Sequence, residues 1–162
     1  TEMVKNLPEN GKVVEWGCGG STVKILELLL PTQSVISIEH DSEWYNNINN
    51  HLLSLNKNNW RLYHKPELPI WKHTVGTPDD ENPVGWDEYI LPTTDILNAD
   101  IYLIDGVARS SIALMLLAKC TNKNAIILIH DANHRGIYYS WVARLFPKAE
   151  MIATSFLRLH LQ

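Results

Sequence analysis

The chain has 162 residues, of which 45% are hydrophobic, which is enough to bury the core of one domain. Its formal net charge at pH 7 is −4 and its Lys and Arg residues form no cluster, so nothing in its charge suggests binding to nucleic acid. No apolar segment approaches the roughly 18–20 residues of a membrane span. The two cysteines, Cys18 and Cys120, are too few for a disulfide framework. We therefore expect a cytoplasmic protein without a nucleic-acid or membrane partner.

Short apolar segments alternate with segments of helical periodicity, which predicts a largely parallel sheet covered by helices on both faces. The predicted strands are residues 12–16, 34–39, 59–64, 100–104, 125–130, 148–153 and 155–161. The predicted helices are residues 20–30, 42–55, 107–119 and 135–145. The last two strands are close enough to form a hairpin. We therefore expect one α/β domain over residues 1–162, with an antiparallel last strand in a seven-stranded sheet.

A glycine-rich loop follows the first predicted strand, and an acid ends the second. Glycines occupy positions 17, 19 and 20, and Ser21 and Thr22 can cap the helix that follows. A loop of this kind exposes bare backbone and the positive end of a helix dipole to a ligand. Glu39 lies 22 residues after Gly17, near the position from which an acid binds ribose hydroxyls in a nucleotide-binding βαβ unit. Together, the loop and the acid predict a nucleotide-type ligand.

The residues around the loop favour a cationic ligand over a dinucleotide. Thr22 occupies the place of the third glycine in the dinucleotide pattern G-x-G-x-x-G. Glu15, two residues before Gly17, would repel a pyrophosphate but could help to hold a cationic amino-acid group. Residues 13–22, Val-Val-Glu-Trp-Gly-Cys-Gly-Gly-Ser-Thr, resemble the first motif of class I S-adenosylmethionine-dependent methyltransferases.

This resemblance extends over roughly residues 11–146. Residues 38–45 resemble the second methyltransferase motif, residues 100–109 the fourth-strand motif beside the methyl group, and residues 125–133 the fifth strand and its exit loop. The four motifs together are similar to a small group of bacterial-type methyltransferases, and the His-Asp-x-Asn segment to plant glucuronoxylan methyltransferases. The resemblance implies a Rossmann-like, doubly wound fold and S-adenosyl-L-methionine as the cofactor. It implies these cofactor-binding residues: Glu15, Gly17, Cys18, Gly19, Gly20, Ser21, Thr22, Glu39, His40 and Asp105.

Methyl transfer to an alcohol requires an aligned nucleophile and the removal of a proton, and groups for both tasks follow the fourth and fifth strands. We expect Asp105 to face the methyl group and Asp131 to orient a base or a substrate hydroxyl. His134 is a candidate for proton abstraction, and Arg109 for binding a carboxylate or phosphate of the substrate. Two of them have a structural alternative: Asp105 as a helix cap, and Arg109 as a partner of Asp131. For His130 we favour the structural role.

Catechol-type O-methyltransferases hold magnesium with an Asp after the fourth strand and an Asp-Asn pair after the fifth. Asp105 and Asp131 match those places, but Ala132 separates Asp131 from Asn133. Magnesium requires near-octahedral coordination by oxygen atoms, and water and substrate would have to supply most of these ligands here. A divalent metal is therefore possible but not favoured.

Residues 65–95 form an irregular insertion with five prolines and three large aromatic residues, Trp71, Trp86 and Tyr89. A flap that packs its own aromatics and a substrate-binding lid are equally good interpretations. Helical spacing places Trp44 on a buried face, so we expect it to be a packing residue. Because the first residue is Thr1 and not a methionine, we expect either a trimmed form or a piece of a longer chain.

The sequence thus predicts methyl transfer to an oxygen atom of a small molecule or sugar-like acceptor. One alternative is a non-catalytic protein that only binds the cofactor. Another is a nicotinamide-dependent oxidoreductase, which would need a third helix-buried glycine and a Tyr-x-x-x-Lys or equivalent, and neither occurs. The acceptor itself has no signature in the sequence.

Overall fold

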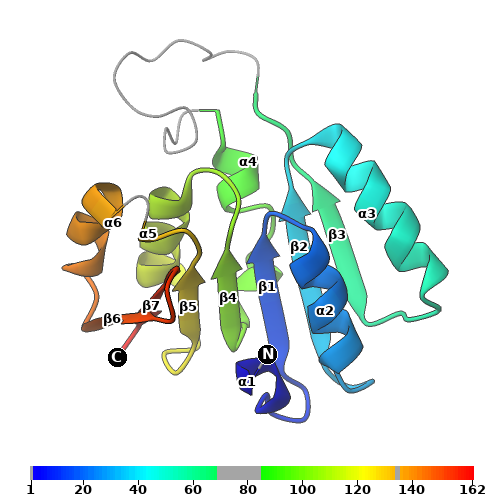
Figure 1. Cartoon of the computed structure of the whole chain (residues 1–162), viewed down its shortest axis with the longest axis horizontal. Helices are drawn as coiled ribbons and strands as arrows, with labels where there is room; N and C mark the ends of the chain where they lie inside the picture. The colour runs from blue at the N-terminus through cyan, green and yellow to red at the C-terminus, as the bar shows by residue number, and fades with distance from the viewer. Residues whose placement is uncertain (1, 69–84, 134–135) are drawn as a thin grey trace.

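The computed structural model describes residues 2–68, 85–133 and 136–162, and in these ranges the chain forms one seven-stranded sheet flanked by helices (Figure 1). The strands are β1 (Lys12–Trp16), β2 (Ser34–Glu39), β3 (Trp60–His64), β4 (Ile101–Ile104), β5 (Ile126–Ile129), β6 (Lys148–Ile152) and β7 (Phe156–His160). The helices are α1 (Glu2–Lys5), α2 (Gly20–Leu28), α3 (Ser42–Ser54), α4 (Asp87–Ile90), η2 (Thr94–Asn98), α5 (Arg109–Lys119) and α6 (Gly136–Ala143). No helix among the described residues is long and apolar enough to cross a membrane.

The strand order is β3-β2-β1-β4-β5-β7-β6, so the chain winds outwards from β1 in both directions. Strands β3, β2, β1, β4 and β5 pair in parallel. Strand β7 pairs antiparallel with both β5 and β6. The predicted fold class, a doubly wound and mostly parallel sheet with an antiparallel last strand, is confirmed.

Two apolar layers fix the sheet between the helices. Alternate residues of β1 point to opposite faces, with Val14 and Trp16 in the layer that includes residues of α5 and α6, and Val13 in the layer beneath α2. Because both faces are buried, a shift of one residue in register would place apolar side chains in the wrong layer. The register therefore fixes where each strand ends.

The ends of the parallel strands meet at one edge of the sheet. Figure 1 shows the carboxyl ends of β1, β2, β4 and β5 side by side at this edge. In an open α/β sheet the loops after these ends bind the ligands. The described residues that the sequence singled out lie in or just after the ends of these four strands and are therefore brought together.

The described end of the 65–95 insertion packs against this edge. The Trp16 indole N–H donates a hydrogen bond to the Tyr89 carbonyl oxygen at 2.9 Å. Trp86 and Tyr89 are buried, and their ring centroids lie 5.3 Å and 5.6 Å from that of His40. This part of the insertion therefore packs its own aromatic side chains. Trp71 lies outside the described residues.

Candidate functional site

A cleft of about 720 Å³ opens at the edge where the parallel strands end. Its volume falls in the range of roughly 300–1,000 Å³ that is usual for small-molecule sites. The glycine loop, the start of α3 and the loop after β4 form its walls. The lining residues are Gly17, Cys18, Gly19, Gly20, Ser21, Glu39, His40, Asp41, Glu43, Trp44, Asn47, Asp105 and Gly106. Eight of the ten residues predicted to bind a cofactor line this cleft; the other two, Glu15 and Thr22, lie behind it.

The three glycines of the loop serve different purposes. Gly17 has a φ of +88°, and a Cβ atom there would lie 2.9 Å from the Gly106 backbone nitrogen, so the backbone itself requires glycine. Gly19 has a φ of 173°, which any residue adopts, and the nearest atoms to a Cβ there are 3.6 Å away, in Trp44. A Cβ on Gly20 would meet nothing within 4 Å. Only Gly17 is therefore required by the loop's own geometry.

Glu15 supports the loop from behind. Its side chain is fully buried, and its Oε2 atom accepts hydrogen bonds from the hydroxyls of Thr22 and Ser37. Thr22 Oγ1 in turn accepts a hydrogen bond from the Gly19 amide at 2.9 Å. Burial raises the pKa of Glu15 to about 7, against the effect of the hydroxyl hydrogen bonds. Its Oε1 atom is buried without a hydrogen-bond partner among the described residues.

Glu39 ties the glycine loop to the end of β2. Its Oε2 accepts a hydrogen bond from the Cys18 amide at 3.0 Å, and its Oε1 accepts from the amides of His40 and Asp41 at 2.8 Å. Burial opposes ionisation of the Glu39 carboxyl, but the hydrogen bonds from His40 and Asp41 outweigh it and lower the pKa. Glu39 is therefore a fixed negative charge in the wall of the cleft.

The cleft is acidic. Four carboxylates line it: Glu39, Asp41, Glu43 and Asp105. Among the described residues of its wall there is no Lys or Arg. Since like charges repel strongly where water is partly excluded, the cleft favours a cationic ligand and disfavours a pyrophosphate.

The expectation that Trp44 is a packing residue is wrong. The side chain is 51% exposed and lines the cleft, and its indole N–H donates a hydrogen bond to the Cys18 carbonyl oxygen. Helix α3 begins at the rim of the cleft, because the Asp41 carboxylate caps it by accepting from the Trp44 amide at 2.7 Å. The first turn of α3 therefore overhangs the loop, and Leu52, further along the helix, is its fully buried residue.

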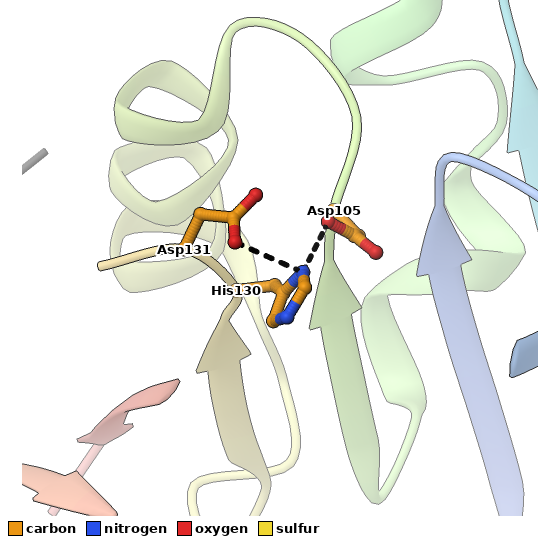
Figure 2. A group of neighbouring side chains, drawn as sticks. All are labelled: Asp105, His130 and Asp131. Atoms are coloured by element: carbon orange, nitrogen blue, oxygen red, sulfur yellow. Dashed lines mark hydrogen bonds and ion pairs between the residues drawn. The ribbon is translucent and has the colours of Figure 1, made fainter. Parts of the chain in front are cut away.

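Asp105, His130 and Asp131 converge from the loops after β4 and β5 (Figure 2). His130 Nδ1 lies 2.8 Å from Asp105 Oδ1 and 3.7 Å from Asp131 Oδ1. All three side chains are half-buried. Asp105, which we expect to face the methyl group, lines the cleft. His134, the candidate for proton abstraction, lies outside the described residues.

Arg109 joins the loop after β4 to the loop after β5. Its guanidinium donates hydrogen bonds to the carbonyl oxygens of Gly106 at 2.7 Å, His130 at 2.6 Å and Asp105 at 3.2 Å. It also lies 3.7 Å from carboxylate oxygens of Asp105 and Asp131. The side chain is only 7% exposed, so its position suits holding the loops and leaves little surface for a substrate anion. The ion pair between Arg109 and Asp131, which was the structural alternative for Arg109, is present.

Asp105, His130 and Asp131 could each offer one ligand atom to a metal ion, with these atoms within 4.8 Å of one another. One nitrogen and two oxygens suit a transition metal better than magnesium. However, a cation among them would stand close to the fixed guanidinium of Arg109, which already balances both carboxylates. We therefore assign no metal to this cluster.

No protein-family model and no curated protein matches the sequence. Solved structures of similar fold include a methyltransferase from Geobacter sulfurreducens, with a TM-score of 0.64 at 11% identity over 98% of this chain and 77% of that one. A precorrin-6y C5,15-methyltransferase from Geobacter metallireducens matches with a TM-score of 0.62 at 11% identity, over 97% and 82%. A spermidine synthase from Thermotoga maritima matches with a TM-score of 0.60 at 12% identity, over 98% and 56%. The chain therefore has the Rossmann-like fold of S-adenosylmethionine-dependent methyltransferases.

Alanine substitution should separate the two kinds of loop glycine. Gly17→Ala forces a side chain into a left-handed backbone conformation and against Gly106, so we expect the free energy of unfolding to fall by about 1–3 kcal/mol. Gly19→Ala meets neither obstacle and should change it by less than about 0.5 kcal/mol. Urea unfolding of both variants checks this. Equal losses would contradict the distinction.

Glu15 should make stability depend on pH. Because its folded-state pKa is raised from 4.5 to about 7, its contribution to stability is fully present below about pH 4.5 and is lost as pH rises through about 7. Glu15→Gln keeps the acceptor oxygen and removes the ionisation. We expect the variant to gain on the order of 3 kcal/mol relative to the wild type between pH 4.5 and pH 8. Urea unfolding at several pH values measures the difference, and a pH-independent difference would show that Glu15 does not titrate in this way.

Proposed function

We propose that this chain is a class I S-adenosylmethionine-dependent methyltransferase that acts on an oxygen atom of a small-molecule or sugar-like acceptor. The observation that carries the proposal is the acidic cleft between the glycine loop and Glu39, lined by four carboxylates and, among the described residues, by no basic side chain of Lys or Arg. S-adenosylmethionine brings a sulfonium and an ammonium group, and both positive charges are favoured in such a cleft.

The parts of the cofactor match the parts of the cleft. The ribose hydroxyls would donate to the remaining lone pairs of Glu39, which is ionised and lines the wall. The carboxylate of the methionine portion would lie at the amino end of α2, beyond Gly19 and Gly20. The sulfonium would then lie towards Asp105, at the end of β4.

A dinucleotide fits less well. A nicotinamide cofactor would place its pyrophosphate in the acidic cleft, where the carboxylates repel it. The position of the third glycine holds Thr22, whose hydroxyl is bonded to both Glu15 and the Gly19 amide. Thr22 thus stabilises the glycine loop in place of the third glycine of a dinucleotide site, which favours a ligand with a single nucleoside.

Catalysis, as opposed to cofactor binding alone, is supported by the polar cluster beside the cleft. Asp105, His130 and Asp131 are half-buried and lie next to the expected position of the methyl group. Because the solved structures with this fold include a spermidine synthase, the fold alone does not select methyl transfer. A cluster that can accept a proton favours an acceptor that must lose one, such as a hydroxyl.

Isothermal titration tests the cofactor and the role of Glu39 together. We expect S-adenosylmethionine and S-adenosylhomocysteine to bind and NAD⁺ not to bind. Glu39→Ala removes charge-assisted acceptors and should weaken S-adenosylhomocysteine binding by about 1.5–3 kcal/mol, roughly 10- to 150-fold. Glu27→Gln is the control, because it removes an exposed charge of α2 outside the cleft and should leave the affinity unchanged. Preferential binding of NAD⁺, or equal effects of the two variants, would contradict the proposal.

A further inference from the structure

His130 has a defined orientation at the end of β5. Its Nδ1 atom lies 2.8 Å from Asp105 Oδ1, and its ring stacks on Phe156 with centroids 4.7 Å apart. Figure 2 shows this nitrogen turned towards both carboxylates and the other ring nitrogen turned away from them. The side chain remains 31% exposed, so it is held in place without being enclosed.

The partner of Nδ1 determines which ring nitrogen is available. An ionised carboxylate only accepts hydrogen bonds, so the proton of the neutral imidazole belongs on Nδ1, facing Asp105. The lone pair then lies on Nε2, which has no hydrogen bond to another described residue. A neutral imidazole nitrogen with a free lone pair is the group that abstracts protons near neutral pH.

The two contact partners of the His130 ring each line a cavity, whereas His130 itself is a lining residue of neither. On one side, its partner Asp105 lines the acidic cleft. On the other side, its stacking partner Phe156 lines an apolar cavity of about 250 Å³. Ser21 lines both cavities, so they adjoin near the start of α2. The imidazole is therefore joined by one contact to the wall of the cleft and by another to the wall of the apolar cavity.

We propose that His130 is the general base of this methyltransferase, an inference that rests on the proposed function. Nε2 takes the proton of the acceptor hydroxyl while an oxygen lone pair forms the bond to the methyl carbon. The bond between sulfur and that carbon breaks, and its electron pair returns to sulfur as the neutral thioether. The positive charge therefore moves from the sulfonium to the imidazolium.

The surroundings of His130 stabilise that charge. The imidazolium would lie 2.8 Å from Asp105 Oδ1 and 3.7 Å from Asp131 Oδ1, so two carboxylates face the charge that develops. Asp105 and Asp131 are then positioning residues, as is Arg109, which holds both loops through their carbonyl oxygens. The acceptor class that needs this base is a hydroxyl that is not ionised at neutral pH.

An acceptor series tests this proposal. Transfer of labelled methyl from S-adenosylmethionine is measured with aliphatic alcohols, phenols and nitrophenols, for the wild type and His130→Gln. The variant should lose at least about 100-fold in kcat with un-ionised alcohols and phenols. It should lose less than about 10-fold with nitrophenols, which are ionised without a base, and its affinity for S-adenosylhomocysteine should stay within about twofold. Equal losses along the series, or no loss, would overturn the assignment.

Two controls distinguish a general base from a metal ligand and from a histidine without a catalytic role. His51→Gln changes an exposed histidine on α3 and should leave the whole series unchanged. Treatment with EDTA should also change nothing. Activity that disappears with EDTA and returns with Mn²⁺ would make His130 a metal ligand and overturn its role as the base.

A measurement without any acceptor completes the test. Nitrogen-15 NMR of histidine-labelled protein with bound S-adenosylhomocysteine should show His130 protonated on Nδ1 and unprotonated on Nε2, and Asp105→Asn should alter this tautomer. A neutral ring protonated on Nε2 would overturn the proposal even if no acceptor in the series reacts. If neither S-adenosylmethionine nor S-adenosylhomocysteine binds to the wild type, the proposed function fails instead, whatever the tautomer of His130.

Discussion

The hydrogen bond from the Cys18 amide to the Glu39 carboxylate joins the glycine loop to the end of β2, and the shape of the cleft depends on it. Glu15 secures the same loop from behind through Thr22, which accepts from the Gly19 amide. Two buried carboxylates thus hold a loop that has little side-chain packing of its own. Burying them costs stability, and their hydrogen bonds offset the cost only in part for Glu15, whose pKa rises to about 7. The position of the loop is therefore fixed at a cost in stability.

On the other side of the cleft, the buried guanidinium of Arg109 fixes the loops after β4 and β5. Arg109 bonds to three carbonyl oxygens in the loops after β4 and β5, and so fixes the spacing between Asp105 and His130. The site thus has an acidic wall that suits a sulfonium and a pair of carboxylates that suits an imidazolium. In the proposed reaction, this division would let one positive charge be bound before methyl transfer and another be stabilised after it.

The order of strands and helices could be predicted from the sequence because apolar strands, helical periodicity and the glycine loop are each visible in a short segment. Their alternation then predicts a parallel sheet covered by helices. Each predicted strand agrees with the structure to within one residue at either end, whereas the four-residue helices α1 and α4 and the short η2 were missed because so few residues show no periodicity. Trp44 was misplaced because helical spacing indicates a common face without showing that the first turn overhangs the cleft.

The contacts between side chains on different strands could not be predicted in the same way. The bond between His130 and Asp105 depends on the turns after β4 and β5, in which Ala108 and Asp131 have φ values of 51° and 56°. Residues other than glycine rarely adopt such values, and the sequence carries no signal for them. The structural role favoured for His130 followed from its strand-end position alone. That expectation remains untested, and the geometry leads us to propose a catalytic role instead.

A crystal structure of the protein with bound S-adenosylhomocysteine tests the central proposal most directly. We expect the ribose hydroxyls against Glu39, the amino-acid portion at the start of α2 and the sulfur atom towards Asp105, with His130 Nε2 facing the space beyond the sulfur. A ligand bound in the apolar cavity beside Phe156, or a sulfur atom turned away from Asp105, would contradict both the assignment of the cleft and the direction of methyl transfer.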